Sequence, residues 1–200
     1  MLKVKCDSQG TDKASEIIAN GGTVIFPTDT VYGIGCDPFN KKAVRKIYEI
    51  KSREERKSMP ILAYSKDVVS TIAKLDDHSE KLAEKFWPGP LTLILELSDD
   101  RLEKSLKIND SIAVRVPKNN CTLEILKKCN FLIGTSANTS GKEPFTDPAK
   151  CYQSLSDFDL FLDGGKISRG VPSTIVDVRD GKLKIIREGT LTKKELMKVL

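Results

Sequence analysis

Apolar and polar residues follow one another in short blocks whose spacing switches between that of strands and that of helices. Apolar runs predict strands at residues 23–26, 61–64, 91–97, 111–116, 131–134, 158–162, 174–178 and 183–186. Apolar positions three and four apart predict helices at about residues 12–20, 41–51, 79–86, 122–128, 148–155 and 192–199. The alternation predicts an α/β fold, and the run of strands near the end of the chain favours a mixed sheet over a purely parallel one.

The helix that follows Asn40 has a stripe of apolar residues that ends in a lysine. Asn40 is a suitable N-cap, and Val44 and Ile47 begin a stripe that continues on one helix face. Lys51 lies on that same face at the end of the helix. We therefore expect the Lys51 ammonium to emerge where the buried face meets a cleft.

Size and composition limit the class of protein. The chain has 200 residues, 39% of them hydrophobic and 30% charged, which is typical of a soluble globular protein. We expect residues 1–200 to form a single domain. No apolar run approaches the roughly 20 residues that a membrane span needs, and the first seven residues lack the apolar region of a signal peptide. These features predict a cytoplasmic protein with no membrane partner.

The cysteines and the single histidine argue against a metal site or a disulfide framework. Five cysteines are an odd number, and no two of them have the spacing of a Cys-x-x-Cys pair. His78 is the only histidine and lies in a polar helix start. We therefore expect no protein metal site, and we expect the cysteines to be small buried or surface residues.

The positive charge of the chain is concentrated in one segment. The formal net charge is +5, and residues 41–57 hold eight Lys or Arg and only three Glu, so the rest of the chain is neutral. This segment is a candidate site for an anion.

Five loops contain residues that are unusual for plain connections: 27–35, 51–53, 86–92, 135–141 and 172–174. Two of them follow predicted strands and are rich in hydroxyl groups, and open α/β sheets bind ligands at such strand ends. Each loop taken alone also fits an ordinary turn, a solvated helix end or a rigid Pro-Gly-Pro corner. The familiar phosphate-binding loops and the His-Glu-x-x-His zinc motif are absent from the sequence.

Arg115 is also unusual, because it lies in the apolar run 111–116. A strand arginine in such surroundings needs a carboxylate or a phosphate as its partner.

Together and in this order, the motifs resemble those of the YrdC-like threonylcarbamoyl-AMP synthase family over residues 21–189. The resemblance is carried by residues 27–35, Lys51-Ser52-Arg53, 87–92, Arg115-Val116-Pro117, Ser136-Ala137-Asn138, Ser140-Gly141, Ser173-Thr174, Asp177, Arg187 and Gly189. It implies a twisted, open mixed sheet with flanking helices around a deep basic cavity, in the short, single-domain form of the family.

The resemblance also implies an activity and partners. Members of the family condense L-threonine, bicarbonate or CO2, and ATP to threonylcarbamoyl-AMP and pyrophosphate, which makes them nucleotidyltransferases. A downstream tRNA threonylcarbamoyl transferase complex then modifies the adenosine beside the anticodon of tRNA. Mg²⁺ is expected with ATP, held by phosphate oxygens and water.

Matching positions imply two sets of site residues. The catalytic and ATP-binding residues are expected to be Lys51, Arg53, Lys57, Ser111, Ser136, Asn138 and Arg187. The threonine-binding residues are expected to be Thr30, Tyr32, Arg115, Gly134 and Ser173. Because the two cations of the Lys51-Ser52-Arg53 motif are expected to face a ligand, replacing either by alanine should abolish activity with little loss of stability.

Three positions depart from the pattern of the family. Leu62 stands where many longer members have a histidine close to the threonine, Pro172 where many have glutamate, and Glu188 where proline is frequent.

Two other functions compete with synthase activity. One is an RNA-binding module for double-stranded RNA or tRNA without ATP chemistry, and the other is a relative that forms carbamoyl-adenylate from carbamoyl phosphate.

Overall fold

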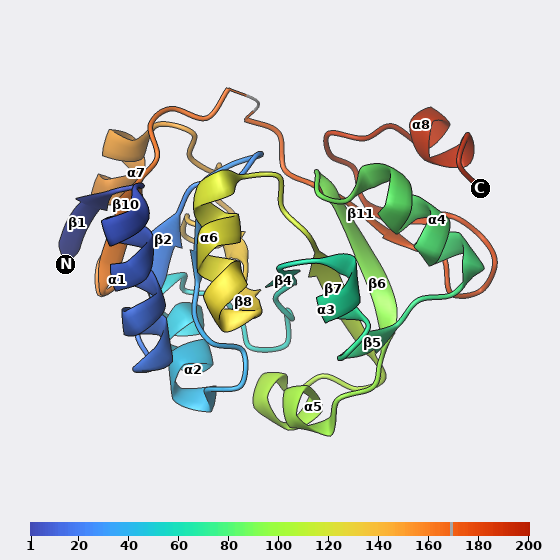
Figure 1. The fold of residues 1–200 in the computed structure, drawn as a ribbon, viewed down its shortest axis with the longest axis horizontal. Coiled ribbons are helices and arrows are strands. Elements are labelled where there is room, and N and C mark those ends of the chain that lie inside the picture. The colour runs from blue at the N-terminus through green and yellow to red at the C-terminus, as the bar shows by residue number, and fades with distance from the viewer. Residues whose placement is uncertain (169) are drawn as a thin grey trace.

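The strands form two twisted mixed sheets that lie side by side in the structure, a computed structural model that describes residues 1–168 and 170–200 (Figure 1). The first sheet has the order β1 (Leu2–Lys5), β10 (Leu160–Asp163), β2 (Val24–Phe26), β3 (Gly33–Gly35) and β9 (Thr135–Ser136). The second has the order β12 (Lys184–Arg187), β11 (Thr174–Asp177), β6 (Leu91–Leu97), β7 (Ser111–Arg115), β4 (Ile61–Ala63) and β8 (Phe131–Ile133), with β5 (Ala73–Lys74) beside β6. Each sheet contains parallel and antiparallel pairs, which confirms the predicted mixed α/β fold.

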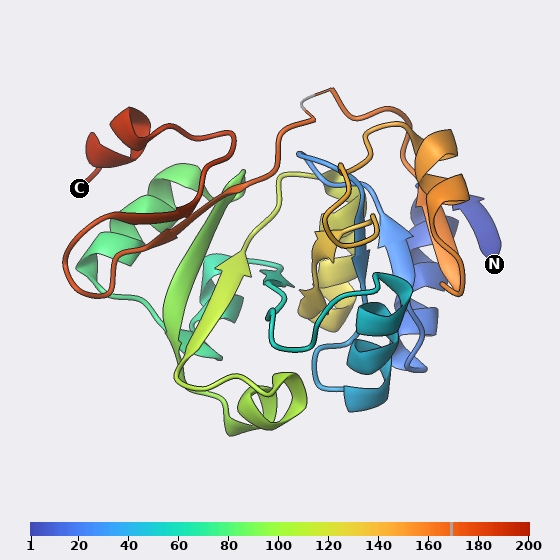
Figure 2. The same cartoon turned by 180° about the vertical axis from the view of Figure 1, so that it is seen from behind.

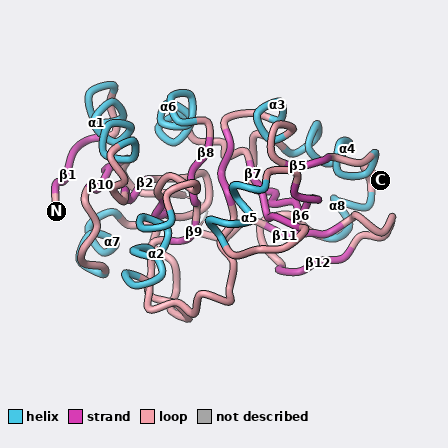
Figure 3. The backbone as a smooth tube through the Cα atoms, turned by 90° about the horizontal axis from the view of Figure 1, so that it is seen from below, coloured by secondary structure: helices cyan, strands magenta, loops and turns pink. Residues whose placement is uncertain are grey.

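Helices cover both sides of the first sheet. The described helices are α1 (Ser8–Ala19), α2 (Lys41–Ile50), α3 (Lys66–Val69), α4 (Asp77–Phe86), α5 (Asp100–Leu106), α6 (Asn120–Cys129), α7 (Pro148–Ser154) and α8 (Lys193–Met197). Helices α1 and α6 lie on one side of the first sheet, and α2 and α7 lie on the other (Figure 3). The view from behind shows α2 and α7 in front of that sheet, with the N- and C-termini at opposite ends of the molecule (Figure 2).

Helix α2 illustrates how the local sequence determines an element. The Asn40 side chain accepts hydrogen bonds from the backbone N–H groups of Lys42 and Ala43, as expected of an N-cap. Val44 and Ile47 are buried on one face of the helix, and Lys51 is its C-cap residue. The predicted cap, apolar face and end of this helix are confirmed.

The sequence did not predict the shortest strands. Strand β3 was expected to be part of a ligand-binding loop, yet its glycines pair with β2 on one side and with β9 on the other. A Cβ atom at Gly35 would lie only 2.9 Å from Cε1 of Phe26, so glycine permits a close approach that a side chain would block. A three-residue strand with glycine at both ends gives too short an apolar pattern to detect.

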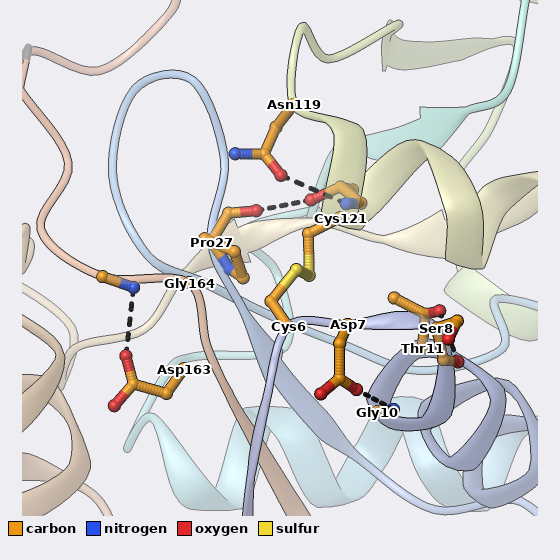
Figure 4. Close-up of a disulfide and its surroundings, with 12 residues drawn as sticks. Cys6, Asp7, Ser8, Gly10, Thr11, Pro27, Asn119, Cys121, Asp163 and Gly164 are labelled. Carbon is orange, nitrogen blue, oxygen red and sulfur yellow. Dashed lines mark hydrogen bonds between the residues drawn. A yellow bond between two sulfur atoms is a disulfide. The ribbon is translucent and has the colours of Figure 1, made fainter.

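A disulfide joins Cys6, just after β1, to Cys121 in the first turn of α6 (Figure 4). The sequence argued against a disulfide framework and led us to expect only small buried or surface cysteines, so it did not predict this pair. Their Cα atoms are 5.9 Å apart, within the usual range for a disulfide, although 115 residues separate them in the sequence. Only the packing of α1 against α6 brings them together, so local spacing could not reveal the pair.

Among the described residues, none of the helices has both the length and the apolar character needed to cross a membrane.

Candidate functional site

A cavity of about 330 Å³ lies between the two sheets. The first sheet contributes residues of β2, β3 and β9, and the second contributes residues of β4, β6, β7, β11 and β12. Arg53, Arg115 and Arg187 line the cavity, and its described lining residues include no carboxylate. Seven of the residues predicted from the sequence meet at this cavity: Thr30, Arg53, Arg115, Gly134, Ser136, Ser173 and Arg187.

The loop that follows β2 is folded by the Thr28 hydroxyl. This hydroxyl accepts hydrogen bonds from the backbone N–H groups of Thr30 and Val31, at 3.1 and 3.2 Å, and it donates to the Val31 carbonyl at 2.7 Å. Such local bonds are typical of threonine in tight turns. The turn holds the Thr30 side chain at the cavity wall.

Arg115 reaches from β7 to this loop and joins the two sheets. Its Nη2 donates to Asp29 Oδ1, its Nη1 donates to the Thr30 hydroxyl at 3.1 Å, and its Nε donates to the Gly89 carbonyl at 2.9 Å. The arginine is 6% exposed and the Asp29 side chain is 10% exposed, so the ion pair is buried. The expectation that Arg115 needs a carboxylate or phosphate partner is confirmed, and the partner is Asp29.

Arg187 and Ser173 form a second polar cluster at the cavity. Nη2 of Arg187 donates to the Ser173 carbonyl at 2.7 Å and to the Ser173 hydroxyl at 3.0 Å. The same hydroxyl lies 2.9 Å from the Thr92 hydroxyl on β6. Arg53 is held separately, because its Nε and Nη2 donate to the carbonyls of Lys57 and Ser58, both at 2.9 Å.

The electrostatics of the cavity favour an anion. Burial and the positive charge of Arg53 lower the pKa of Arg187. Burial also lowers the pKa of Arg115, and Arg187 adds to this effect, while the Asp29 carboxylate opposes it. Cations that lower one another's pKa gain free energy when an anion enters between them.

The face of the second sheet toward the cavity also carries an apolar patch. Ile94 on β6 pairs in register with Ala113 on β7, and Ile175 on β11 and Ile186 on β12 lie nearby on the same cavity wall. We did not predict this patch from the sequence. Its signal was present in residues 91–95, where apolar residues occupy both faces of one strand instead of one face only.

Lys51, which we expected to face a ligand, lies behind the cavity wall and is absent from the described lining. The residue is 1% exposed, and its Nζ donates to the carbonyl oxygens of Ser136 and Asn138, the latter at 2.7 Å. The Lys51 carbonyl accepts from the N–H of Ser140 at 2.8 Å. Burial, and then the charge of Arg53, lower the Lys51 pKa to about 8. Lys51 thus holds the loop that carries Ser136 and does not face the cavity.

Four further candidates are absent from the described cavity lining: Tyr32, Lys57, Ser111 and Asn138. Tyr32 is fully buried, and its hydroxyl donates to the Gly165 carbonyl at 2.8 Å, so it anchors the segment after β10. Lys57 is exposed and pairs with Glu54 at 3.0 Å. Ser111 lies at the far end of β7, four residues from Arg115.

Asn138 stabilises its own loop. Its Nδ2 donates to the carbonyls of Thr139 and Lys142, at 2.9 and 2.6 Å. Its Oδ1 is buried and has no partner among the described residues. The motif of Ser136 and Asn138 therefore places one side chain at the cavity and uses the other to shape the loop.

Comparison with known proteins connects this geometry to a family. Residues 16–189 match the model of the Sua5_yciO_yrdC family, whose description reads "Telomere recombination". A relative from Methanocaldococcus jannaschii is 39% identical over 177 residues, which is 87% of this chain and 83% of that protein.

The matches from Pyrococcus abyssi include a sequence and a solved structure. Its threonylcarbamoyl-AMP synthase is 34% identical over 193 residues, and this chain spans 56% of its length. The crystal structure of P. abyssi Sua5 complexed with L-threonine matches all of this chain and 59% of that one, with a TM-score of 0.90 and 30% identity. The agreement of fold and sequence over nearly the whole chain shows that it belongs to the Sua5/YciO/YrdC family.

Proposed function

We propose that the protein is an L-threonylcarbamoyladenylate synthase, a nucleotidyltransferase that condenses L-threonine, bicarbonate or CO2, and ATP to threonylcarbamoyl-AMP and pyrophosphate. The observation that carries the proposal is the cavity itself. It brings three arginines together with hydroxyl groups and an apolar patch, and Asp29, which pairs with Arg115 from outside the described lining, leaves the charges of Arg53 and Arg187 for an anion. The names of the P. abyssi relatives, a threonylcarbamoyl-AMP synthase and a Sua5 complexed with L-threonine, support the same activity.

The reaction explains why the cavity is cationic. The threonine amine and bicarbonate or CO2 form a carbamate, and a carbamate oxygen then attacks the α-phosphorus of ATP. The new P–O bond forms as the bond to pyrophosphate breaks, and pyrophosphate leaves with the electron pair. One anion must approach another, so arginines that neutralise the triphosphate lower the barrier. Because a carbamate is already anionic, the attack needs no histidine as general base.

The amino acid binds at the polar end of the cavity. Arg115 is already fixed by Asp29, Thr30 and Gly89, and its guanidinium has one further N–H on Nη1 and one on Nη2 to donate to the threonine carboxylate. Thr30, Gly134 and Ser173 line the same cavity and complete the subsite.

ATP takes the remainder of the cavity. Arg53 and Arg187 bind the triphosphate, and Ser136 donates a hydrogen bond to a phosphate or ribose oxygen. The adenine lies on the patch of Ile94, Ala113, Ile175 and Ile186, since a planar base is well matched by an apolar surface. Mg²⁺ enters with the triphosphate as part of the substrate. The product then passes to a tRNA threonylcarbamoyl transferase complex.

The proposal is tested by pyrophosphate release from ATP in the presence of L-threonine, bicarbonate and Mg²⁺. We expect release that requires both threonine and bicarbonate. Arg53→Ala should lose most of this activity, because it removes a triphosphate contact. Arg56→Ala is the matched control, because Arg56 is exposed and lies three residues away outside the cavity lining.

Other outcomes of this assay support competing functions. Release that persists without threonine or bicarbonate would refute the synthase. Release that requires carbamoyl phosphate would identify a carbamoyl-adenylate-forming relative. Tight binding of tRNA with no ATP chemistry would identify an RNA-binding module.

A further inference from the structure

Leu62 is placed beside the arginine that holds the substrate carboxylate. It is the central residue of β4, and the parallel pairing of β4 with β7 sets Leu62 in register with Arg115. Partners in register project from the same face of a sheet, and neighbouring strands are about 4.8 Å apart. Both residues line the cavity. A ligand whose carboxylate lies on Arg115 therefore has its next atoms beside Leu62.

The Leu62 side chain lies directly on the backbone of Gly134. A Cβ atom at Gly134 would be 2.7 and 2.9 Å from the two methyl carbons of Leu62, so only glycine leaves room for this leucine. Phe26 and Pro60 line the same cavity. Phe26 belongs to the same apolar cluster as Leu62, and the N–H of Gly134 donates to the Pro60 carbonyl at 2.9 Å. These four residues form a corner of the cavity whose side chains carry no hydrogen-bonding group.

We propose that Leu62 determines the amino-acid selectivity of this protein, by contacting the side chain of the amino acid that Arg115 binds. The inference rests on the proposed function and names a residue that sets its substrate. The corner accepts a methyl branch but offers no partner to a hydroxyl. The methyl of threonine therefore packs against Leu62, and its hydroxyl turns toward the hydroxyl groups of Thr30 and Ser173, which line the same cavity.

Serine lacks this methyl group, which provides the test. A single methyl contact in an apolar pocket changes selectivity by roughly 10- to 200-fold. The wild-type protein should therefore bind L-threonine more tightly than L-serine, and Leu62→Ala should reduce this preference by about tenfold. The space vacated by Leu62 should also improve the binding of L-isoleucine relative to the wild type.

The experiment measures the dissociation constants of L-threonine, L-serine and L-isoleucine by calorimetry, together with pyrophosphate release for each amino acid. Leu132→Ala is the matched control. Leu132 is the register partner of Leu62 on β8 and is 0% exposed, against 3% for Leu62, but it is not part of the cavity lining. It should leave the threonine-to-serine ratio unchanged. Leu62→Met, which conserves volume, should also keep the ratio, and Leu62→Val replaces Leu62→Ala if the latter does not fold.

The outcomes separate this inference from the proposed function. If the wild type is an active synthase and Leu62→Ala keeps its threonine-to-serine ratio, the inference is wrong and the function stands. If the ratio of dissociation constants shifts as expected but no pyrophosphate is released, the inference stands and the function is wrong. If the wild type binds none of the three amino acids, both are wrong.

Discussion

Lys51 contributes to the site through the carbonyl groups that it holds. Its Nζ donates to Ser136 and Asn138, so replacing it with methionine leaves two carbonyl oxygens without their donor. We expect Lys51→Met to lower the free energy of unfolding by about 1–3 kcal/mol. Because the loop that carries Ser136 is then misplaced, pyrophosphate release should fall by about a hundredfold. Urea unfolding and the release assay measure the two effects.

Arg53→Ala provides the comparison. Its side chain is half-buried and bonds, among the described residues, to carbonyls of its own loop, so this variant should lose activity while its free energy of unfolding changes by less than about 1 kcal/mol. Equal stability of the two variants would contradict the positioning role of Lys51.

With its pKa lowered to about 8, Lys51 is charged below that pH and loses its proton above it. Wild-type kcat/KM should therefore fall above about pH 8, since this quantity reports groups of the free enzyme.

The sequence predicted the chemistry of single residues better than their orientation. Arg115 was recognised as needing an anionic partner, because burying an unpaired guanidinium costs free energy whatever its orientation. Lys51 and Tyr32 were expected at the ligand, but both are buried outside the described cavity lining. The rotamer of such a side chain determines whether it contacts a ligand or its own loop. The spacing of residues in the sequence does not determine that rotamer. Leu62 was recognised as a departure from the family, but its contact with Gly134 required the fold.

At the scale of elements, the Cys6–Cys121 disulfide ties the N-terminal segment to the start of α6. The closed loop contains more than a hundred residues, and chain entropy predicts a contribution of about 4–5 kcal/mol for a loop of that length. We expect Cys6→Ala to lower the Tm of the oxidised protein by about 10 °C. Thermal unfolding in the absence and presence of a dithiol reductant measures the effect.

Cys129→Ala is the control for this measurement. Cys129 ends α6, is partly buried and is a free cysteine, so its loss should change the Tm much less. The reductant should lower the Tm of the wild type and of Cys129→Ala but not that of Cys6→Ala. A wild-type Tm that is the same with and without reductant would mean that the disulfide does not stabilise the protein.

Long, patterned elements could be predicted, whereas short ones could not. Strand β6 was predicted with its bounds as observed, and α2 with its cap, because each has enough apolar positions to define a period. Strands β3 and β9 have three and two residues, and their pairing depends on neighbours that are distant in the sequence. These short strands carry residues of the cavity wall, so the site was harder to predict than the core.

At the scale of the whole molecule, the cavity exists because two sheets are held at a fixed separation. Asp29 follows a strand of the first sheet and Arg115 ends a strand of the second, so their buried pair is a direct link between the sheets. The backbone N–H of Lys118, just beyond β7, also donates to Asp29 at 3.0 Å. The same link orients the guanidinium that receives the substrate carboxylate in the proposed reaction.

Breaking this link should therefore affect stability and substrate binding together. Asp29→Asn leaves the Arg115 charge buried without its counterion, and we expect the free energy of unfolding to fall by about 3–5 kcal/mol. Glu49→Gln removes an exposed ion pair with Arg45 and should cost less than about 1 kcal/mol. In hydrogen exchange, Asp29→Asn should lower protection in both residues 27–35 and β7, because the loss acts on both sheets. Its KM for threonine should rise more than that for ATP, since Arg115 is no longer oriented. Loss of protection in one sheet alone would show that the pair does not couple the two halves.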